Sequence, residues 1–257
     1  ILKISHAECN VPQIQYDLLR WCCVSRINYW LRNNFPVHTG TATNLSFAAR
    51  HDDMIFDAFW KILRAEEVFG LQPDCLNRAN LPPRSQAQLQ TKSSGGFELR
   101  AQKPLCDAAY VGSWALTAHF IPLVAPLLDD FIRNISNSDL APAAHLQAAS
   151  DKTGNFIDLD SLIERATPFI QRSLSEHQND EAANKYKQEV LAAGNQSAIA
   201  AFHSMDDDKS GNWLDALPGR EAFRIMNAEA WLYNAMRRLM LPICEDLGGK
   251  TCQCGAN

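Results

Sequence analysis

The chain has 257 residues, 46% of them hydrophobic, and its 24 basic against 29 acidic residues give a formal net charge of −5. These proportions are ordinary for a globular protein, and they exclude a disordered tail, which would combine few apolar residues with a large net charge. No apolar run approaches the roughly 20 residues of a membrane-spanning helix. The mild acidity argues against a stand-alone nucleic-acid coat protein, which carries a positive field.

Both ends of the sequence suggest that it continues. The chain starts at Ile1 without a signal-peptide pattern, and it stops just after Cys252 and Cys254, in the middle of what could be a metal-ligand cluster. We therefore expect it to be a piece of a longer polypeptide.

The eight cysteines favour a reducing environment. Dense disulfides belong to short secreted domains that lack a core, whereas this chain is long enough to bury one. Cys22 and Cys23 lie in an apolar helical stretch, where a reduced cysteine acts as a small hydrophobe. The expected location is intracellular, either nuclear or cytoplasmic.

Helical periodicity is the dominant pattern of the sequence. Apolar residues recur at three- and four-residue steps over 13–32, which predicts a widely buried helix that ends before Pro36. A second helix is expected at about 52–69, with acidic residues at its positive end and Gly70 as its stop. Residues 71–103 are rich in Pro, Ser, Gln and Gly and predict an irregular connection.

Further helices are expected downstream. One starts near Leu105, and Pro122 and Pro126 break or kink the chain after it. The composition predicts a polar loop at 137–155, which could contain short helices, and one or two long polar helices at 158–193.

The C-terminal part predicts a short helix at 197–203 and a last helix at 228–240 with Asn227 as its N-cap. Strand-like alternation is scarce throughout. The expected fold class is therefore all-α, an irregular helical bundle with a long polar connector helix and a loop-rich C-terminal tail. The shift from apolar to polar composition predicts three consecutive parts: a thumb-like bundle at 1–136, connector helices at 137–206 and a C-terminal helix and tail at 207–257.

The residue pattern gives little support for a metal site. Residues 206–213 imitate the start of a calcium loop, but Leu217 stands where the loop needs a glutamate. Cys252-x-Cys254 has metal-like spacing, yet a structural zinc site needs four ligands. We expect no cofactor in this chain, and zinc at Cys252 and Cys254 only if residues further downstream complete the cluster.

No catalytic residues can be assigned. The seven histidines are scattered outside any nucleophile context, and no glycine-rich phosphate loop is present. The pair Arg237-Arg238 near a helix C-terminus could contact a phosphate or simply complement the helix dipole. Both interpretations stay open.

Seven blocks of sequence form an ordered series. They are Leu18-Leu19-Arg20-x-Cys22 with 26–36, Phe47–Asp52, Leu81-Pro82-Pro83-Arg84 with Gly95-Gly96-Phe97-Glu98-Leu99-Arg100, 108–114, 211–218, 228–242, and Cys252-x-Cys254-Gly255. In order and spacing, this series resembles the region downstream of the polymerase core in non-LTR (LINE-type) retrotransposon reverse transcriptases. The last block resembles the opening of that family's zinc-type cluster.

The chain departs from the family pattern in several ways, which include a longer insertion between Leu81 and Gly95. Glu98 and Ala101 stand where the pattern carries a glycine and a serine, which puts the backbone geometry of this turn in question, because glycine permits conformations that glutamate rarely adopts. The family's catalytic aspartates are missing from this chain. The resemblance thus implies a non-catalytic segment whose parent protein is an RNA-directed DNA polymerase.

The resemblance implies a thumb-like and connector region that helps to seat a template–primer duplex. The expected partner is RNA or an RNA–DNA hybrid, with Arg237 and Arg238 as candidate contacts to its phosphates. The alternative is a domesticated or relic helical domain that binds proteins instead, for which we expect an exposed apolar patch. An unrecognised enzyme has no supporting group of residues.

Overall fold

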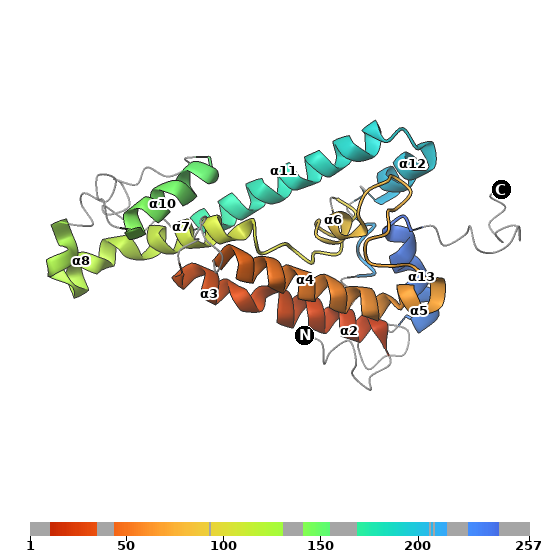
Figure 1. Cartoon of the computed structure of the whole chain (residues 1–257), viewed down its shortest axis with the longest axis horizontal. Helices are drawn as coiled ribbons and strands as arrows, with labels where there is room; N and C mark the ends of the chain where they lie inside the picture. Colours follow the sequence, from red (N-terminus) through yellow and green to blue (C-terminus); the bar gives the residue numbers. More distant parts are fainter. Residues whose placement is uncertain are drawn as a thin grey trace, which may run out of the picture. The chain divides into compact units, whose positions relative to one another are not determined.

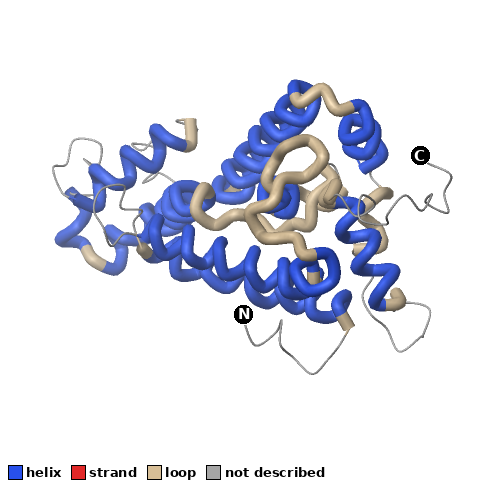
Figure 2. The backbone as a smooth tube through the Cα atoms, turned by 45° about the vertical axis from the view of Figure 1, so that its right-hand side comes forward, coloured by secondary structure: helices blue, strands red, loops and turns tan. Residues whose placement is uncertain are grey.

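The computed structural model describes residues 11–34, 44–92, 94–130, 141–154, 169–205, 207, 209–214 and 226–241. Throughout these ranges the regular elements are helices joined by loops and turns, as Figure 2 shows. The predicted all-α class is confirmed. No helix in the described ranges combines the length and the apolar character needed to cross a membrane.

The chain forms two compact units, and each is assembled from separate stretches. The first unit contains Ile1–Val24, Met54–Arg100 and Ala182–Asn257, and the second contains Ser25–Asp53 and Ala101–Glu181. They do not follow the three consecutive parts expected from composition. Composition along a chain reports how polar each stretch is, whereas a compact unit is defined by which stretches bury their apolar faces together.

The first helical run changes its geometry along its length. Helix α2 (Pro12–Leu18) continues into a π-helical stretch at Leu19–Cys23 and a 3-10 stretch at Val24–Ile27, and then into α3 (Asn28–Asn33). The predicted helix at 13–32 is therefore present but is not a regular α-helix. Extended backbone at Asn34 ends it.

The second predicted helix is two helices. Helix α4 (Asn44–Leu63) begins earlier than expected, and Arg64, with φ of 50°, separates it from α5 (Ala65–Phe69). Gly70 caps α5 in a left-handed conformation, as predicted. Because α4 starts at Asn44, Asp52 lies inside the helix rather than at its positive end, and its carboxylate accepts hydrogen bonds from the backbone amides of Gln102 and Lys103 at 2.7 and 3.0 Å.

The prolines act as expected on the next helices. After the short helix α6 (Pro83–Ala87), α7 (Leu105–Thr117) passes through a 3-10 turn into α8 (Ile121–Val124) and another 3-10 turn at Pro126–Leu128. Pro122 and Pro126 each occupy the first turn of one of these short elements, where a missing amide hydrogen costs nothing.

One stretch is more helical than expected. Helix α10 (Ala141–Lys152) occupies most of the stretch at 137–155, for which the sequence predicts a polar loop with short helices. Ala143, Leu146 and Ala149 recur at three-residue steps and are all buried in the core of the second unit. This apolar stripe is narrow, and two of its three residues are alanines, so the polar composition of the stretch masked the helical periodicity.

The C-terminal helices lie close to the positions that the sequence predicts. Helix α11 (Ile170–Ala192) is the long polar helix, α12 (Gln196–Met205) is the short one, and α13 (Ala228–Arg238) is the last, all labelled in Figure 1. The expected start of the long helix at 158 lies outside the described residues. Asn227 caps α13 as predicted, since its side-chain oxygen accepts the Glu229 amide at 2.8 Å.

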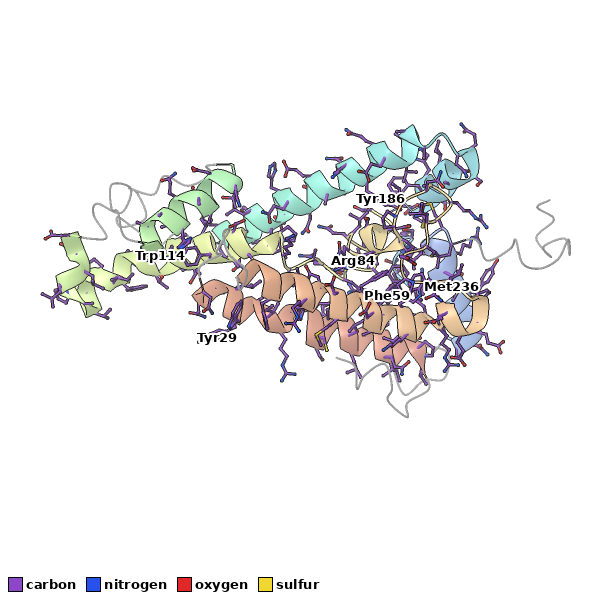
Figure 3. The ribbon with its side chains drawn as sticks, viewed as in Figure 1. Tyr29, Phe59, Arg84, Trp114, Tyr186 and Met236 are labelled. Atoms are coloured by element: carbon purple, nitrogen blue, oxygen red, sulfur yellow. The ribbon has the colours of Figure 1, made fainter. Side chains whose placement is uncertain are left out.

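An aromatic cluster forms the core of the first unit. The ring of Tyr16 lies 5.8 Å from that of Phe97 and 5.6 Å from that of Trp231, and Phe59 lies 4.9 Å from Phe97. Figure 3 shows Phe59 and Met236 close together, between α4 and α13. Burying several large aromatic side chains in contact makes this cluster the main apolar stabilisation of the unit.

The second unit is built around α7. The buried face of α7 packs against α3, where Ala109 and Leu31 share one apolar cluster, and against α10, where Ala108 and Leu146 share another. Cys106, in the same face, is buried, and this burial raises the pKa of its thiol to about 12.

Candidate nucleic-acid interface

The two candidate arginines lie in the last turn of α13 but in different environments. Consecutive residues of an α-helix point about 100° apart. Arg237 is exposed to solvent, whereas Arg238 is 4% exposed. The sequence predicts the same role for both arginines, whereas the structure exposes one and buries the other.

Arg238 binds backbone carbonyls inside the first unit. Its Nε donates to the carbonyl of Gly96 at 3.0 Å, its Nη1 to Ser210 at 3.0 Å, and its Nη2 to Thr91. The guanidinium also lies 5.9 Å from the ring centre of Phe97. A planar guanidinium with five donors suits this task, because it satisfies three carbonyls from two separate loop segments at once.

A buried polar network extends this arrangement to α6 and α11. The Gln86 side-chain amide donates to the carbonyls of Arg238 and Gly95. The hydroxyl of Tyr186 donates to Gln86 at 3.0 Å and accepts from Asn77 at 3.1 Å. Burial raises the pKa of Tyr186, so its hydroxyl stays protonated and keeps the donor that this network needs.

The turn at Gly95–Arg100 has an unusual backbone conformation at Glu98. Glu98 has φ of 55°, in the left-handed region that favours glycine, although a glutamate stands here. Its carboxylate pairs with Arg20 and, at 2.9 Å, with Arg100. A Cβ at Gly96 would lie 2.1 Å from the Leu89 carbonyl oxygen, so the chain needs a glycine at that point.

A pocket of about 270 Å³ opens beside Arg237. Its walls come from α12, the turn at 210–213 and α13, and its lining residues are Ala201, Ser204, Met205, Ser210, Trp213, Asn234, Arg237 and Arg238. In the described part of the chain, this lining carries two guanidiniums and no carboxylate. We call this site the Arg237 pocket.

The lining combines a cation with an aromatic side chain. Arg237 forms no ion pair with any described residue, so its guanidinium is available to an anion. Trp213 is half-buried, and its indole meets that of Trp231 edge-on at 6.1 Å. The pocket can thus accept a phosphate next to a flat ring.

Sequence reasoning found part of this site. It selected Arg237 and missed Trp213, Ser204 and Asn234. The three-residue spacing of Asn234 and Arg237 on one helix was a usable signal for Asn234. Trp213 and Ser204 come from other segments, and only folding brings them to α13.

The other candidate residues are not placed. Cys252 and Cys254 lie outside the described residues, and so do Asp206 and Asp208 of the calcium-like turn. Across the described ranges, no three His, Cys, Asp or Glu side chains come together in a group that could hold a metal ion.

Four of the blocks behind the reverse-transcriptase resemblance contribute to one core. Leu19, Phe97, Leu214, Trp231 and Leu241 are all buried in the aromatic cluster of the first unit. Two of these blocks also meet at Arg238, which lies in one and binds the carbonyl of Gly96 in the other, and its third contact, the carbonyl of Ser210, directly precedes the 211–218 block. Blocks that are far apart in sequence therefore form one packed structure.

Comparison with known proteins adds no identification. No family model matches the chain, and no curated protein and no solved structure matches it.

Proposed function

We propose that this chain is a non-catalytic helical segment of a retroelement reverse transcriptase and that it contributes to binding RNA or an RNA–DNA hybrid. The observation that carries the proposal is the exposed Arg237 guanidinium beside a pocket whose described lining has no carboxylate. The packing of the resemblance blocks into one core supports the same interpretation, because it gives those blocks a shared structural purpose.

The net charge of −5 does not conflict with this function. Proteins position nucleic acids through individual contacts to phosphate oxygens, and such contacts depend on the local arrangement of donors. A segment that neutralises few phosphates binds weakly. Its affinity still falls as salt rises, but with a shallow slope, because each phosphate contact releases only about one counterion. Arg238 does not contribute directly in this scheme, since carbonyls occupy its donors.

The test is fluorescence anisotropy of a labelled RNA–DNA hybrid, titrated with the chain across a salt series. Arg237→Gln is compared with Lys61→Gln, which removes the same charge from an exposed residue outside the pocket. We expect Arg237→Gln to weaken binding several-fold and to lower the salt slope by about 0.7–0.9, the value of one phosphate contact. Lys61→Gln is expected to leave both quantities nearly unchanged.

Two results would contradict the proposal. One is the absence of binding by the unmodified chain even at low salt. The other is equal loss in Arg237→Gln and Lys61→Gln, because it would show a general charge effect. Both positions are exposed, so neither change should shift stability by more than about 0.5 kcal/mol.

A second candidate function is protein binding, and one surface favours it. Five apolar side chains lie exposed within nine residues on and around α8: Phe120, Leu123, Val124, Leu127 and Leu128. Exposed apolar patches are typical of protein interaction sites. Under this function the chain does not bind the hybrid at any salt concentration, so the same titration separates the two candidates.

A further inference from the structure

We infer that the Arg237 pocket takes a single unpaired nucleotide, with its phosphate on Arg237 and its base against Trp213. The inference rests on the proposed function and adds the form of nucleic acid that the site prefers. A paired base keeps its faces stacked inside a duplex, so only an unpaired base can offer a face to an aromatic side chain.

The size of the pocket suits one such unit. Its volume of about 270 Å³ lies just under the range of about 300–1,000 Å³ that holds drug-sized ligands. Arg237 is exposed, so the sugar–phosphate backbone can continue past the pocket while one base enters it.

Trp213 is held in place before any ligand arrives. Its indole packs edge-on against Trp231, which is fully buried and lies 5.6 Å from the ring of Tyr16. An aromatic side chain fixed by the core loses little conformational entropy when a base stacks on it. Stacking then contributes directly to affinity, as in other single-strand binding sites.

The polar lining complements the edge of a base. The Ser204 hydroxyl donates to the carbonyl of Ala201 at 2.7 Å and keeps its oxygen lone pairs for an incoming donor. The Asn234 side-chain nitrogen donates to the carbonyl of Ala230 at 2.8 Å, which leaves the amide oxygen as an acceptor. Amino and imino groups of a base are donors, so these two side chains match them, while Arg237 matches the phosphate.

The experiment compares a blunt RNA–DNA hybrid with the same hybrid carrying a short single-stranded overhang. We expect the unmodified chain to bind the overhang at least about fivefold more tightly, the contribution of one stacked base. Ser204→Glu adds a negative charge to the pocket at an exposed position and should abolish this preference. Gln196→Glu adds the same charge to the same helix outside the pocket lining and should preserve it.

Trp213→Leu and Trp213→Phe test the stacking itself. Leucine removes the aromatic face and should lose the overhang preference, while phenylalanine should retain most of it. Because Trp213 packs against the core of the first unit, thermal unfolding of both variants is measured alongside. Ser204→Glu tests the pocket without altering that core.

The outcomes separate the inference from the function beneath it. If the unmodified chain binds both hybrids equally, or if Ser204→Glu keeps the preference for the overhang, the inference that the Arg237 pocket binds a nucleotide is wrong. Salt-dependent binding that Arg237→Gln weakens would still support the proposed function in that case. If neither hybrid binds, the proposed function is wrong and the inference is wrong with it.

Discussion

At the scale of single residues, Glu98 shows how charge offsets backbone strain. A non-glycine residue in the left-handed region costs about 1–2 kcal/mol. The Glu98 carboxylate faces two guanidiniums, and that of Arg20 is almost fully buried. An unpaired buried cation is costly, so these pairs hold Glu98 in a conformation that it would otherwise avoid.

We predict that Glu98→Gly is more stable than Glu98→Ala by about 1 kcal/mol. Both changes remove the ion pairs, but only glycine also removes the steric cost of the positive φ. Both variants are expected to be less stable than the unmodified chain, because Arg20 loses its carboxylate partner. Urea unfolding measures the three free energies. An alanine variant as stable as the glycine variant would show that the turn relaxes out of the left-handed conformation.

At the scale of elements, small residues decide how closely helices approach. Gly112 lies in the middle of α7, where helix propensity alone disfavours glycine by about 1 kcal/mol relative to alanine. In the second unit a Cβ at this position would lie 2.4 Å from the Cβ of Gln171 and 3.0 Å from its Cα, on α11. Packing between the two helices therefore requires the glycine that propensity disfavours.

We predict that Gly112→Ala destabilises the chain by about 1–3 kcal/mol, the usual cost of overpacking. Propensity predicts the opposite sign, so the direction of the change is itself informative. The control is Ser113→Ala at the next position of α7, which should change stability by no more than about 0.5 kcal/mol. Thermal unfolding followed by circular dichroism measures both. A stabilised Gly112→Ala variant would mean that α7 and α11 do not pack at this point.

At the scale of the whole molecule, folding depends on stretches that are distant in sequence. The first unit takes helices from the N-terminal quarter and from the last third of the chain. Its aromatic cluster needs Tyr16 and Phe59 from one and Trp231 and Met236 from the other. A cut at the composition boundary near residue 136 therefore separates the two halves of one core.

We predict that a fragment of residues 1–136 does not fold on its own. It keeps Tyr16 and Phe59 but loses Trp231, which contacts the Tyr16 ring, and it exposes apolar surface that the intact chain buries. The fragment should show little helical circular dichroism and no cooperative thermal transition, whereas the full chain shows both. A cooperative transition in the fragment would support the consecutive arrangement that composition suggested.

Helix positions were readable from the sequence because their signals are local. Three- and four-residue periodicity, the Asn227 cap, the Gly70 stop and the prolines after α7 depend on neighbouring residues only, and the structure confirms them. The resemblance to retroelement reverse transcriptases, and with it the nucleic-acid function, also came from local blocks and stays a proposal.

Other features depend on contacts between distant residues, and no local pattern encodes them. The two neighbouring arginines have different environments. Arg238 is buried and donates hydrogen bonds to the carbonyls of Thr91, Gly96 and Ser210, which lie 28 to 147 positions away in the sequence, whereas Arg237 is exposed to solvent. In the same way, Trp213 and Ser204 join Arg237 in one pocket only through folding. Periodicity reports which side of a helix is apolar, but burial and hydrogen bonding are set by the segments that pack against that side.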